Sequence, residues 1–213
     1  MLTLYDYFRS SAAYRLRIAL NLKGLAYTQI PVHLVRGGGE HLKADYRAIN
    51  PQARVPSLVT DDGETLTQSP AILEWLEETC PEPPLLPGDA MTRAKVRAIA
   101  SIVACDIHPL NNLVVMNYLK GTFGASSPDI DIWYANWVRQ GFEAIEALLP
   151  DNGPFAFGAT PTLADIYLVP QVFNARRFNV ALDKFPKIIG CDAACQKIAA
   201  FANAHPDLQA DRD

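Results

Sequence analysis

The sequence predicts an α/β domain followed by an all-helical domain. In the first 80 residues, short apolar and aromatic runs alternate with stretches of helical periodicity. From residue 89 to the end, helical periodicity dominates almost throughout. The stretch between them, residues 81–88, holds four prolines and a glycine and cannot continue a helix. We therefore expect domains at 1–80 and 89–213, joined by a linker at 81–88.

The elements of the first domain follow from local signals. Ser10 and Ser11 precede a helical run that Lys23 and Gly24 end, and Ser69 is expected to cap another helix that has Pro70 at its first position. An Asp-Gly pair at 62–63 marks a hairpin turn. Strands are expected at 2–8, 26–32, 55–60 and 64–67, and a short helix at 42–49. This order, βαβα followed by ββα, is consistent with a thioredoxin-type sandwich.

Several boundary signals divide the helical domain into elements. A long run begins at Asp89 and reaches Lys120 with Gly121 as its stop, and Pro109 is expected to kink it. A second long helix opens at residues 127–129, Ser-Pro-Asp. Residues 162–165, Thr-Leu-Ala-Asp, resemble a capping box, and a last helix is expected at about 188–204.

The composition excludes several classes of partner. The 213 residues are 49% hydrophobic, with a net charge of −4 and a pI near 5.6, so a nucleic-acid or anionic-membrane partner is not expected. The start lacks a secretory signal, and no apolar run approaches the roughly 18 residues of a spanning helix. The four cysteines are scattered, as expected of reduced thiols in the cytoplasm. Cys191 and Cys195 lie one helical turn apart but lack further ligands, so no metal is expected.

Over almost its whole length the chain resembles the zeta class of glutathione transferases. The matching stretches keep the order and spacing of that class, at residues 7–11, 15–20, 50–56, 68–74, 107–112, 162–165, 168–172 and 175–178. The resemblance implies the glutathione transferase fold, glutathione as cofactor and a homodimer. Members of the class often read Ser-Ser-Cys-Ser-Trp where this chain has Ser-Ser-Ala-Ala-Tyr at 10–14. No role of that cysteine carries over to Ala12, so bound glutathione is the only sulfur nucleophile expected in the site.

The first helix offers what a thiolate needs. A thiol of pKa near 8.5 is only a few per cent ionised at neutral pH, and lowering its pKa by two units requires about 2.7 kcal/mol. A helix N-terminus supplies roughly 0.3–1 kcal/mol, and a hydroxyl donating to a charged acceptor roughly 1.5–3 kcal/mol. Ser10 or Ser11 offers both together. By resemblance Ser10 is the thiolate donor with Ser11 nearby, and the main donor of the two stays open.

The resemblance also implies the remaining contacts to glutathione. Val55-Pro56 matches the position of a cis-proline that turns the preceding backbone outward to pair with an extended peptide. Gln68 and Ser69, at a helix N-terminus, match the residues that hold the γ-glutamyl end. Four further residues are expected to contact glutathione: Arg15, His41, His108 and Asn112.

Two arginines are expected to hold the carboxylates of a small-molecule substrate. By resemblance these are Arg9 and Arg177, whose planar guanidinium groups can bind carboxylates bidentately. The resemblance implies a glutathione-dependent cis–trans isomerase that converts maleylacetoacetate to fumarylacetoacetate in the catabolism of aromatic amino acids. The thiolate adds to the cis double bond, the resulting single bond rotates, and glutathione leaves unconsumed.

Three alternatives stay open. Maleylpyruvate is the rival substrate, but class members that use it can carry arginines just after the double asparagine, where this chain has Leu113 and Val114. Conjugation or dehalogenation of small electrophiles needs the same thiolate without the pair of arginine contacts. A non-catalytic, transferase-like module would not need Ser10, the Val55-Pro56 pair or Gln68 and Ser69 intact.

Overall fold

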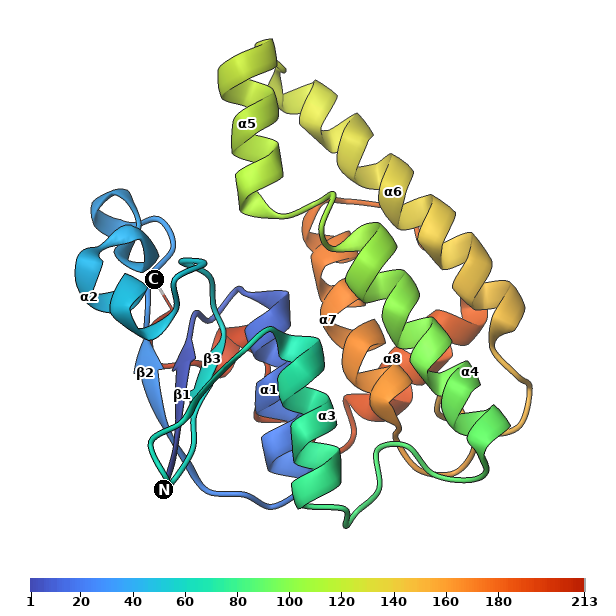
Figure 1. Ribbon diagram of the computed structural model, residues 1–213. Coiled ribbons are helices and arrows are strands. Elements are labelled where there is room, and N and C mark those ends of the chain that lie inside the picture. Colours follow the sequence, from blue (N-terminus) through green and yellow to red (C-terminus); the bar gives the residue numbers. More distant parts are fainter. Residues whose placement is uncertain (213) are drawn as a thin grey trace. The chain divides into compact units, whose positions relative to one another are not determined.

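The computed structural model describes residues 1–212, which form two compact units (Figure 1). One unit comprises Met1–Pro84 together with the chain from Lys197 onward, and the other comprises Leu85–Gln196. The final segment thus belongs with the α/β unit, although its helical periodicity alone would group it with the helices before it. No helix among the described residues is long and apolar enough to cross a membrane.

The first unit is built on a four-stranded mixed sheet of order β2-β1-β3-β4. β1 and β2 are parallel, and β3 is antiparallel to both β1 and β4. The parallel pair requires a crossover, which α1 supplies. The predicted thioredoxin-like order of elements is therefore confirmed, with strands β1 (Leu2–Asp6), β2 (Tyr27–Pro31), β3 (Ser57–Val59) and β4 (Thr65–Thr67) and helices α1 (Ser11–Leu22), α2 (Ala44–Ile49) and α3 (Ser69–Thr79).

The ends of α1 follow the predicted signals. Ser10 is its N-cap, and the Ser10 hydroxyl accepts a hydrogen bond from the backbone N–H of Ala13. The helix ends at Lys23, followed by Gly24 with φ of 64°, a left-handed conformation that favours glycine. Two 3₁₀ turns, η1 (Arg36–Gly38) and η2 (Glu40–Leu42), precede α2, so the helix expected at 42–49 is two shorter elements.

The expected cap of α3 is wrong by one residue. Gln68 is the N-cap, and Ser69 is the first helical residue. Gln68 adopts a positive φ of 67°, and its carbonyl already accepts the first helical hydrogen bond, from Ile72 N–H at 3.0 Å. Gln68 directly follows β4 and caps the helix without a side-chain hydrogen bond, so its residue type does not signal the cap.

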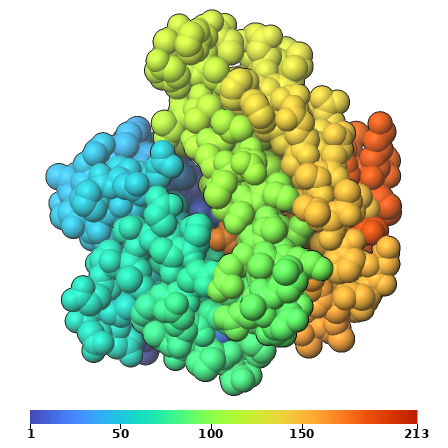
Figure 2. Space-filling view, turned by 45° about the vertical axis from the view of Figure 1, so that its right-hand side comes forward, coloured from blue at the N-terminus to red at the C-terminus, as the bar shows by residue number. Residues whose placement is uncertain are grey.

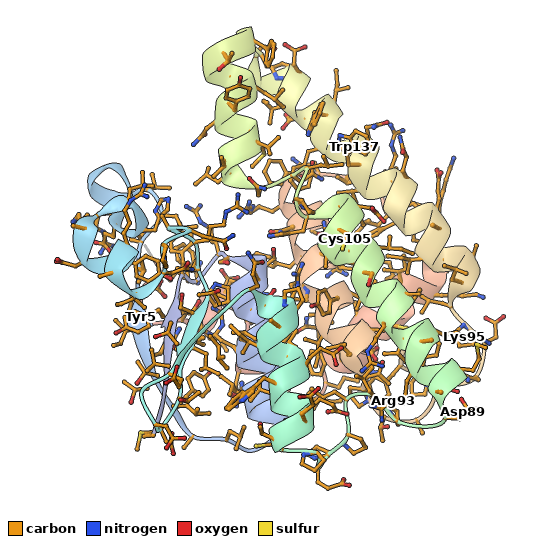
Figure 3. The ribbon with its side chains drawn as sticks, in the orientation of Figure 1. Tyr5, Asp89, Arg93, Lys95, Cys105 and Trp137 are labelled. Carbon is orange, nitrogen blue, oxygen red and sulfur yellow. The ribbon has the colours of Figure 1, made fainter. Side chains whose placement is uncertain are left out.

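The second unit consists of helices arranged around the buried helix α7. Its elements are α4 (Ala90–Ser101), the π-helical segment η3 (Ile102–Ile107), α5 (Leu113–Phe123), α6 (Ser127–Leu148), α7 (Leu163–Arg177) and α8 (Pro186–Cys195). Asp89 caps α4, at the lower right of Figure 3. The predicted start of α7 is confirmed, because the Asp165 carboxylate accepts from both the N–H and the hydroxyl of Thr162.

The long run expected from Asp89 to Lys120 is two helices, so a single kinked helix is wrong. The first ends through η3 before Pro109, and Asn112 caps a new helix by accepting from Val115 N–H at 3.0 Å. The second passes Gly121 and ends at Gly124, whose φ is 68°. Figure 2 shows α5 and the start of α6 in yellow-green at the top of this unit.

The last helix expected, at about 188–204, is also divided. Its first part is α8, and its second part is α9 (Ala199–Ala202), followed by the 3₁₀ turn η4 (Pro206–Leu208). The two parts belong to different units, since the division falls between Gln196 and Lys197. Periodicity did not reveal this boundary because both parts share helical spacing.

Candidate functional site

Ser10 stands at the positive end of α1. Its side chain is half-buried, while Ser11 is 4% exposed. The Ser10 hydroxyl accepts from Ala13 N–H at 3.2 Å, and its own proton can be donated to an anion in front of the helix. Of the two serines, Ser10 therefore has the better access for stabilising a thiolate.

Arg9 is an exposed cation that directly precedes Ser10 in the sequence. Its Nη2 and Nε donate to the hydroxyl of Tyr7 at 2.8 and 3.2 Å, and its guanidinium lies 5.0 Å from the ring centroid of Phe8. Tyr7 is itself fixed by an edge-on contact with His33, at 4.8 Å between centroids. These contacts orient a guanidinium one residue before Ser10, where it can bind a carboxylate.

The loop before β3 presents an unpaired peptide. The Val55–Pro56 bond is cis, as the resemblance implies. Among residues 1–212, the backbone N–H and C=O of Val55 have no hydrogen-bond partner. The loop around it is well anchored, because Tyr46 Oη and Asn50 Nδ2 both donate to the carbonyl of Arg54 at 2.7 Å. A fixed peptide with both groups available suits pairing with an extended peptide ligand.

The N-terminus of α3 carries two more predicted residues. Ser69 is 3% exposed, and its Oγ accepts a hydrogen bond from Nη1 of Arg15 at 3.3 Å. Arg15 is 1% exposed, so it supports the start of α3 from the protein side. Gln68 is exposed, and its amide donates to Oε1 of Gln52 at 2.5 Å. A buried cation and a helix N-terminus together favour a bound carboxylate.

His41 lies in η2, and its ring covers Gly39. Its Nδ1 is buried and makes no hydrogen bond to the described residues. Burial lowers the pKa of His41, and the neighbouring Arg47 charge lowers it further. The imidazole is therefore neutral at physiological pH, and it can offer a neutral polar contact.

The second unit holds the other three predicted residues. His108 and Asn112 flank the break between η3 and α5, where the Asn112 amide caps α5 and donates to the carbonyl of Pro109 at 2.6 Å. Arg177 is the exposed last residue of α7, with its guanidinium 5.0 Å from the ring centroid of Phe178. Burial raises the pKa of Tyr134 to about 12, although the nearby Arg177 charge acts in the opposite direction.

The structure thus brings together two groups of candidates in the first unit. Arg9, Ser10 and Ser11 are consecutive at the start of α1, and Arg15 joins α1 to Ser69. Sequence reasoning missed Tyr7 as the residue that holds Arg9, although Tyr7 opens the first matching stretch. It also missed Tyr134, which stacks on Phe178 at 3.8 Å and is near Arg177. Neither contact can be read from the spacing of residues along the sequence.

A thioredoxin-like unit with a serine at the start of its first helix and a cis-proline before β3, joined to a helical unit, defines a glutathione-binding protein of the transferase fold. Residues 9–79 match the family model for the N-terminal domain of glutathione S-transferase, and residues 136–204 match the C-terminal one. The chain belongs to the glutathione transferase family, in its zeta class.

Two curated relatives and one solved structure illustrate the similarity. The maleylpyruvate isomerase of a Ralstonia species is 54% identical, covering 98% of this chain and 98% of its own. The maleylacetoacetate isomerase of Pseudomonas aeruginosa is 50% identical, covering 98% of this chain and 97% of its own. The maleylacetoacetate isomerase of Anaeromyxobacter dehalogenans, solved with glutathione in its active site, has a TM-score of 0.89 at 44% identity, covering 100% of this chain and 98% of its own.

Proposed function

We propose that this chain is a glutathione-dependent cis–trans isomerase that converts maleylacetoacetate to fumarylacetoacetate. One observation carries the proposal: Arg9 is held by Tyr7 one residue before the half-buried hydroxyl of Ser10. A thiolate donor and a carboxylate-binding cation are thereby proposed at consecutive positions where α1 begins. A transferase acting on neutral electrophiles would need only the first of these. The name of the relative at 50% identity supports this reaction, and the name of the relative at 54% identity supports isomerisation of a related substrate, maleylpyruvate.

The residues of the first unit fit glutathione. Val55 offers both backbone groups to its peptide, and Ser69 with the α3 N-terminus offers an anion site to a carboxylate. Ser10 would donate a hydrogen bond to the sulfur. When bound, glutathione supplies the thiol that adds to the double bond and leaves again, so it acts as a cofactor.

The chain's own residues would then perform three tasks. The Ser10 hydroxyl and the α1 N-terminus favour the thiolate over the thiol. Arg9 holds one substrate carboxylate, and we assign a second carboxylate to Arg177, whose guanidinium is exposed at the end of α7. With both carboxylates held, the glutathione adduct rotates only about the single bond that replaces the cis double bond. Backbone N–H groups at the start of α1 are suited to stabilise negative charge that develops on the ketone oxygen.

Maleylpyruvate is the second candidate substrate, and the 54% identity to the Ralstonia enzyme favours it. Against it, Leu113 and Val114 occupy the first turn of α5 directly after Asn112, so that turn contributes no cation for a carboxylate. We therefore retain maleylacetoacetate as the first choice.

We further propose that the enzyme is a cytoplasmic homodimer. The apolar helix α5 has no buried residue, and Val114, Tyr118 and Phe123 are all exposed. Apolar side chains gathered on one exposed helix are typical of surfaces that another chain covers. The resemblance to a dimeric class agrees with this assignment.

The decisive experiment follows the isomerisation of maleylacetone, a stable analogue of maleylacetoacetate, with and without glutathione. We expect turnover that requires glutathione and leaves its concentration unchanged, with maleylpyruvate turned over more slowly. Faster turnover of maleylpyruvate would reverse the substrate assignment. Glutathione binding without isomerisation would favour conjugation, and absence of binding would favour a non-catalytic module.

Two variants separate isomerisation from conjugation. Arg9→Lys and Arg177→Lys keep the charge but lose the planar fork that a carboxylate matches. We expect each to lower kcat/KM for maleylacetone about tenfold or more, while glutathione conjugation to a neutral electrophile changes less than threefold. Equal losses in both reactions would contradict a role in holding substrate carboxylates.

A further inference from the structure

The C-terminal segment packs against the elements that carry the first part of the site. Asn21 of α1 donates to the carbonyl of Ala200 at 3.0 Å, and Gln29 of β2 donates to Oε1 of Gln209 at 3.3 Å. The ring of His205 meets the ring of Tyr14 edge-on, at 6.1 Å between centroids. All of these residues belong to the first unit, and the segment is drawn in red behind the sheet in Figure 1.

This segment reaches the turn before α1 from two sides. The backbone N–H of Phe8 donates to Oδ2 of Asp211 at 2.9 Å. The carbonyl of Phe8 accepts from Nη2 of Arg17 at 3.0 Å, and Nε of the same guanidinium donates to the carbonyl of Ala204 at 3.0 Å. Both polar groups of the Phe8 backbone are therefore held by the C-terminal segment, one directly and one through Arg17.

Arg17 anchors the carbonyl of Phe8 to the sheet. It is fully buried, and its Nη1 lies 2.8 Å from each carboxylate oxygen of Asp6. Gln29 donates to the same carboxylate at 2.6 Å. Because Asp6 ends β1, the guanidinium is anchored to the sheet and presents fixed donors to Phe8 and Ala204.

Asp211 makes the direct contact with Phe8. Its side chain is only partly buried, and its second oxygen, Oδ1, is buried without a hydrogen-bond partner among residues 1–212. The same carboxylate repels Asp6. A carboxylate with one unpaired oxygen beside a like charge contributes little net stability. Its main effect is to fix the position of the Phe8 backbone through the hydrogen bond to Phe8 N–H.

The position of Phe8 in turn determines that of the predicted site residues. The guanidinium of Arg9 packs on the Phe8 ring, and Ser10 N–H donates to the Tyr7 carbonyl at 2.9 Å across the same turn. A shift of about 1 Å in a group that orients a substrate can cost about a hundredfold in rate.

We infer that Asp211 is a positioning residue, through which the C-terminal segment holds the turn that carries Arg9 and Ser10. The inference rests on the proposed function, because it assigns importance to the placement of these two residues. Asp211 has no proposed contact with substrate or glutathione. It acts on the site through its hydrogen bond to the Phe8 backbone.

The test compares Asp211→Ala, Asp211→Asn and the control Asp207→Ala in the full-length chain. Asp207 is an exposed carboxylate of the same segment, and within residues 1–212 its side chain pairs with His205 and Arg212. We expect Asp211→Ala to lower kcat/KM for maleylacetone by roughly tenfold to a hundredfold. Asp211→Asn should recover much of this, since an amide oxygen still accepts from Phe8 N–H. Asp207→Ala should behave as the original protein.

Two further measurements separate positioning from stability. Hydrogen exchange of the Phe8 amide should become at least about tenfold faster in Asp211→Ala, with the melting temperature changed by no more than a few degrees. Faster exchange with unchanged kcat/KM would overturn the positioning role, as would equal losses in Asp211→Ala and Asp207→Ala. If the original protein does not isomerise maleylacetone, the proposed function fails separately. In that case the exchange rate of the Phe8 amide and the glutathione affinity of Asp211→Ala decide whether the C-terminal segment positions the turn. If both are unchanged from the original protein, the positioning role is overturned.

Discussion

Gly141 of α6 lies directly against the side chain of Ile107 in η3. A β-carbon built at position 141 would overlap both Cγ1 and Cδ1 of Ile107. Both residues are buried, and the two elements run side by side in Figure 1. The absence of a side chain at 141 therefore allows α6 to approach the π-helical segment.

Gly141→Ala should destabilise the protein by about 1–3 kcal/mol, because the added methyl group overpacks this contact. Gly190→Ala is the matched control: Gly190 is exposed in α8, and no atom lies within 4 Å of a β-carbon there. It should stabilise by about 0.4–1 kcal/mol through the unfolded state. Urea unfolding measures both changes. Ile107→Ala removes both overlapping carbons, so adding it to Gly141→Ala should destabilise less than the sum of the two single losses, and full additivity would point to a backbone cause.

Ser10→Ala should impair both the fold and the reaction. Loss of the N-cap hydrogen bond to Ala13 costs about 1 kcal/mol in the free energy of unfolding. Loss of a hydrogen bond to the thiolate costs about 1.5–3 kcal/mol, or roughly 10- to 150-fold in turnover at neutral pH. The turnover loss should shrink at alkaline pH, where the glutathione thiol ionises unaided. A larger effect of Ser11→Ala would transfer the donor role to Ser11.

Ser69→Ala should weaken glutathione binding more than it slows the bound complex. The hydroxyl accepts from the buried Arg15, so its removal takes away the proposed glutathione contact and an acceptor of that guanidinium. We expect the KM for glutathione to rise about tenfold, with kcat reduced less than threefold. Thr79→Ala, which removes an exposed hydroxyl at the other end of α3, should leave both constants unchanged.

The cysteines should differ sharply in reactivity. Cys105 is exposed on η3 (Figure 3), whereas Cys191 and Cys195 are buried. Burial raises the pKa of Cys191 to about 12 and raises that of Cys195 further. A thiol reagent at pH 8 should modify Cys105 within minutes and the buried pair only after unfolding. Mass spectrometry of the labelled protein identifies the sites, and early modification of Cys191 would contradict the burial.

The same pKa shift predicts an alkaline loss of stability. In the unfolded chain these thiols ionise near pH 8.5, but folded Cys191 keeps its proton until about pH 12. The unfolded state therefore binds fewer protons between these values, and the free energy of unfolding falls as pH rises. Cys191→Ser should flatten this decline in urea titrations between pH 8.5 and 10.

Local signals predicted the elements whose ends depend on near neighbours. Ser10, Gly24 and the Thr162–Asp165 pair act on residues within four positions, so their structures follow from residue type. Prediction failed at helix ends where residue preference alone did not identify the cap. Gln68 caps α3 through its backbone in place of Ser69, and Asn112 starts a new helix just beyond Pro109.

The sequence by itself determined the order of elements, the family and the residue types available for binding glutathione, because periodicity, caps and matching stretches are local properties of the chain. Only the tertiary structure decided that Arg15 is buried behind Ser69, that Tyr7 orients Arg9, and that Asp211 holds Phe8 across 203 positions of sequence. These contacts join residues whose spacing carries no signal, since burial and hydrogen bonding between distant segments arise only when the sheet, helices and C-terminal segment pack together.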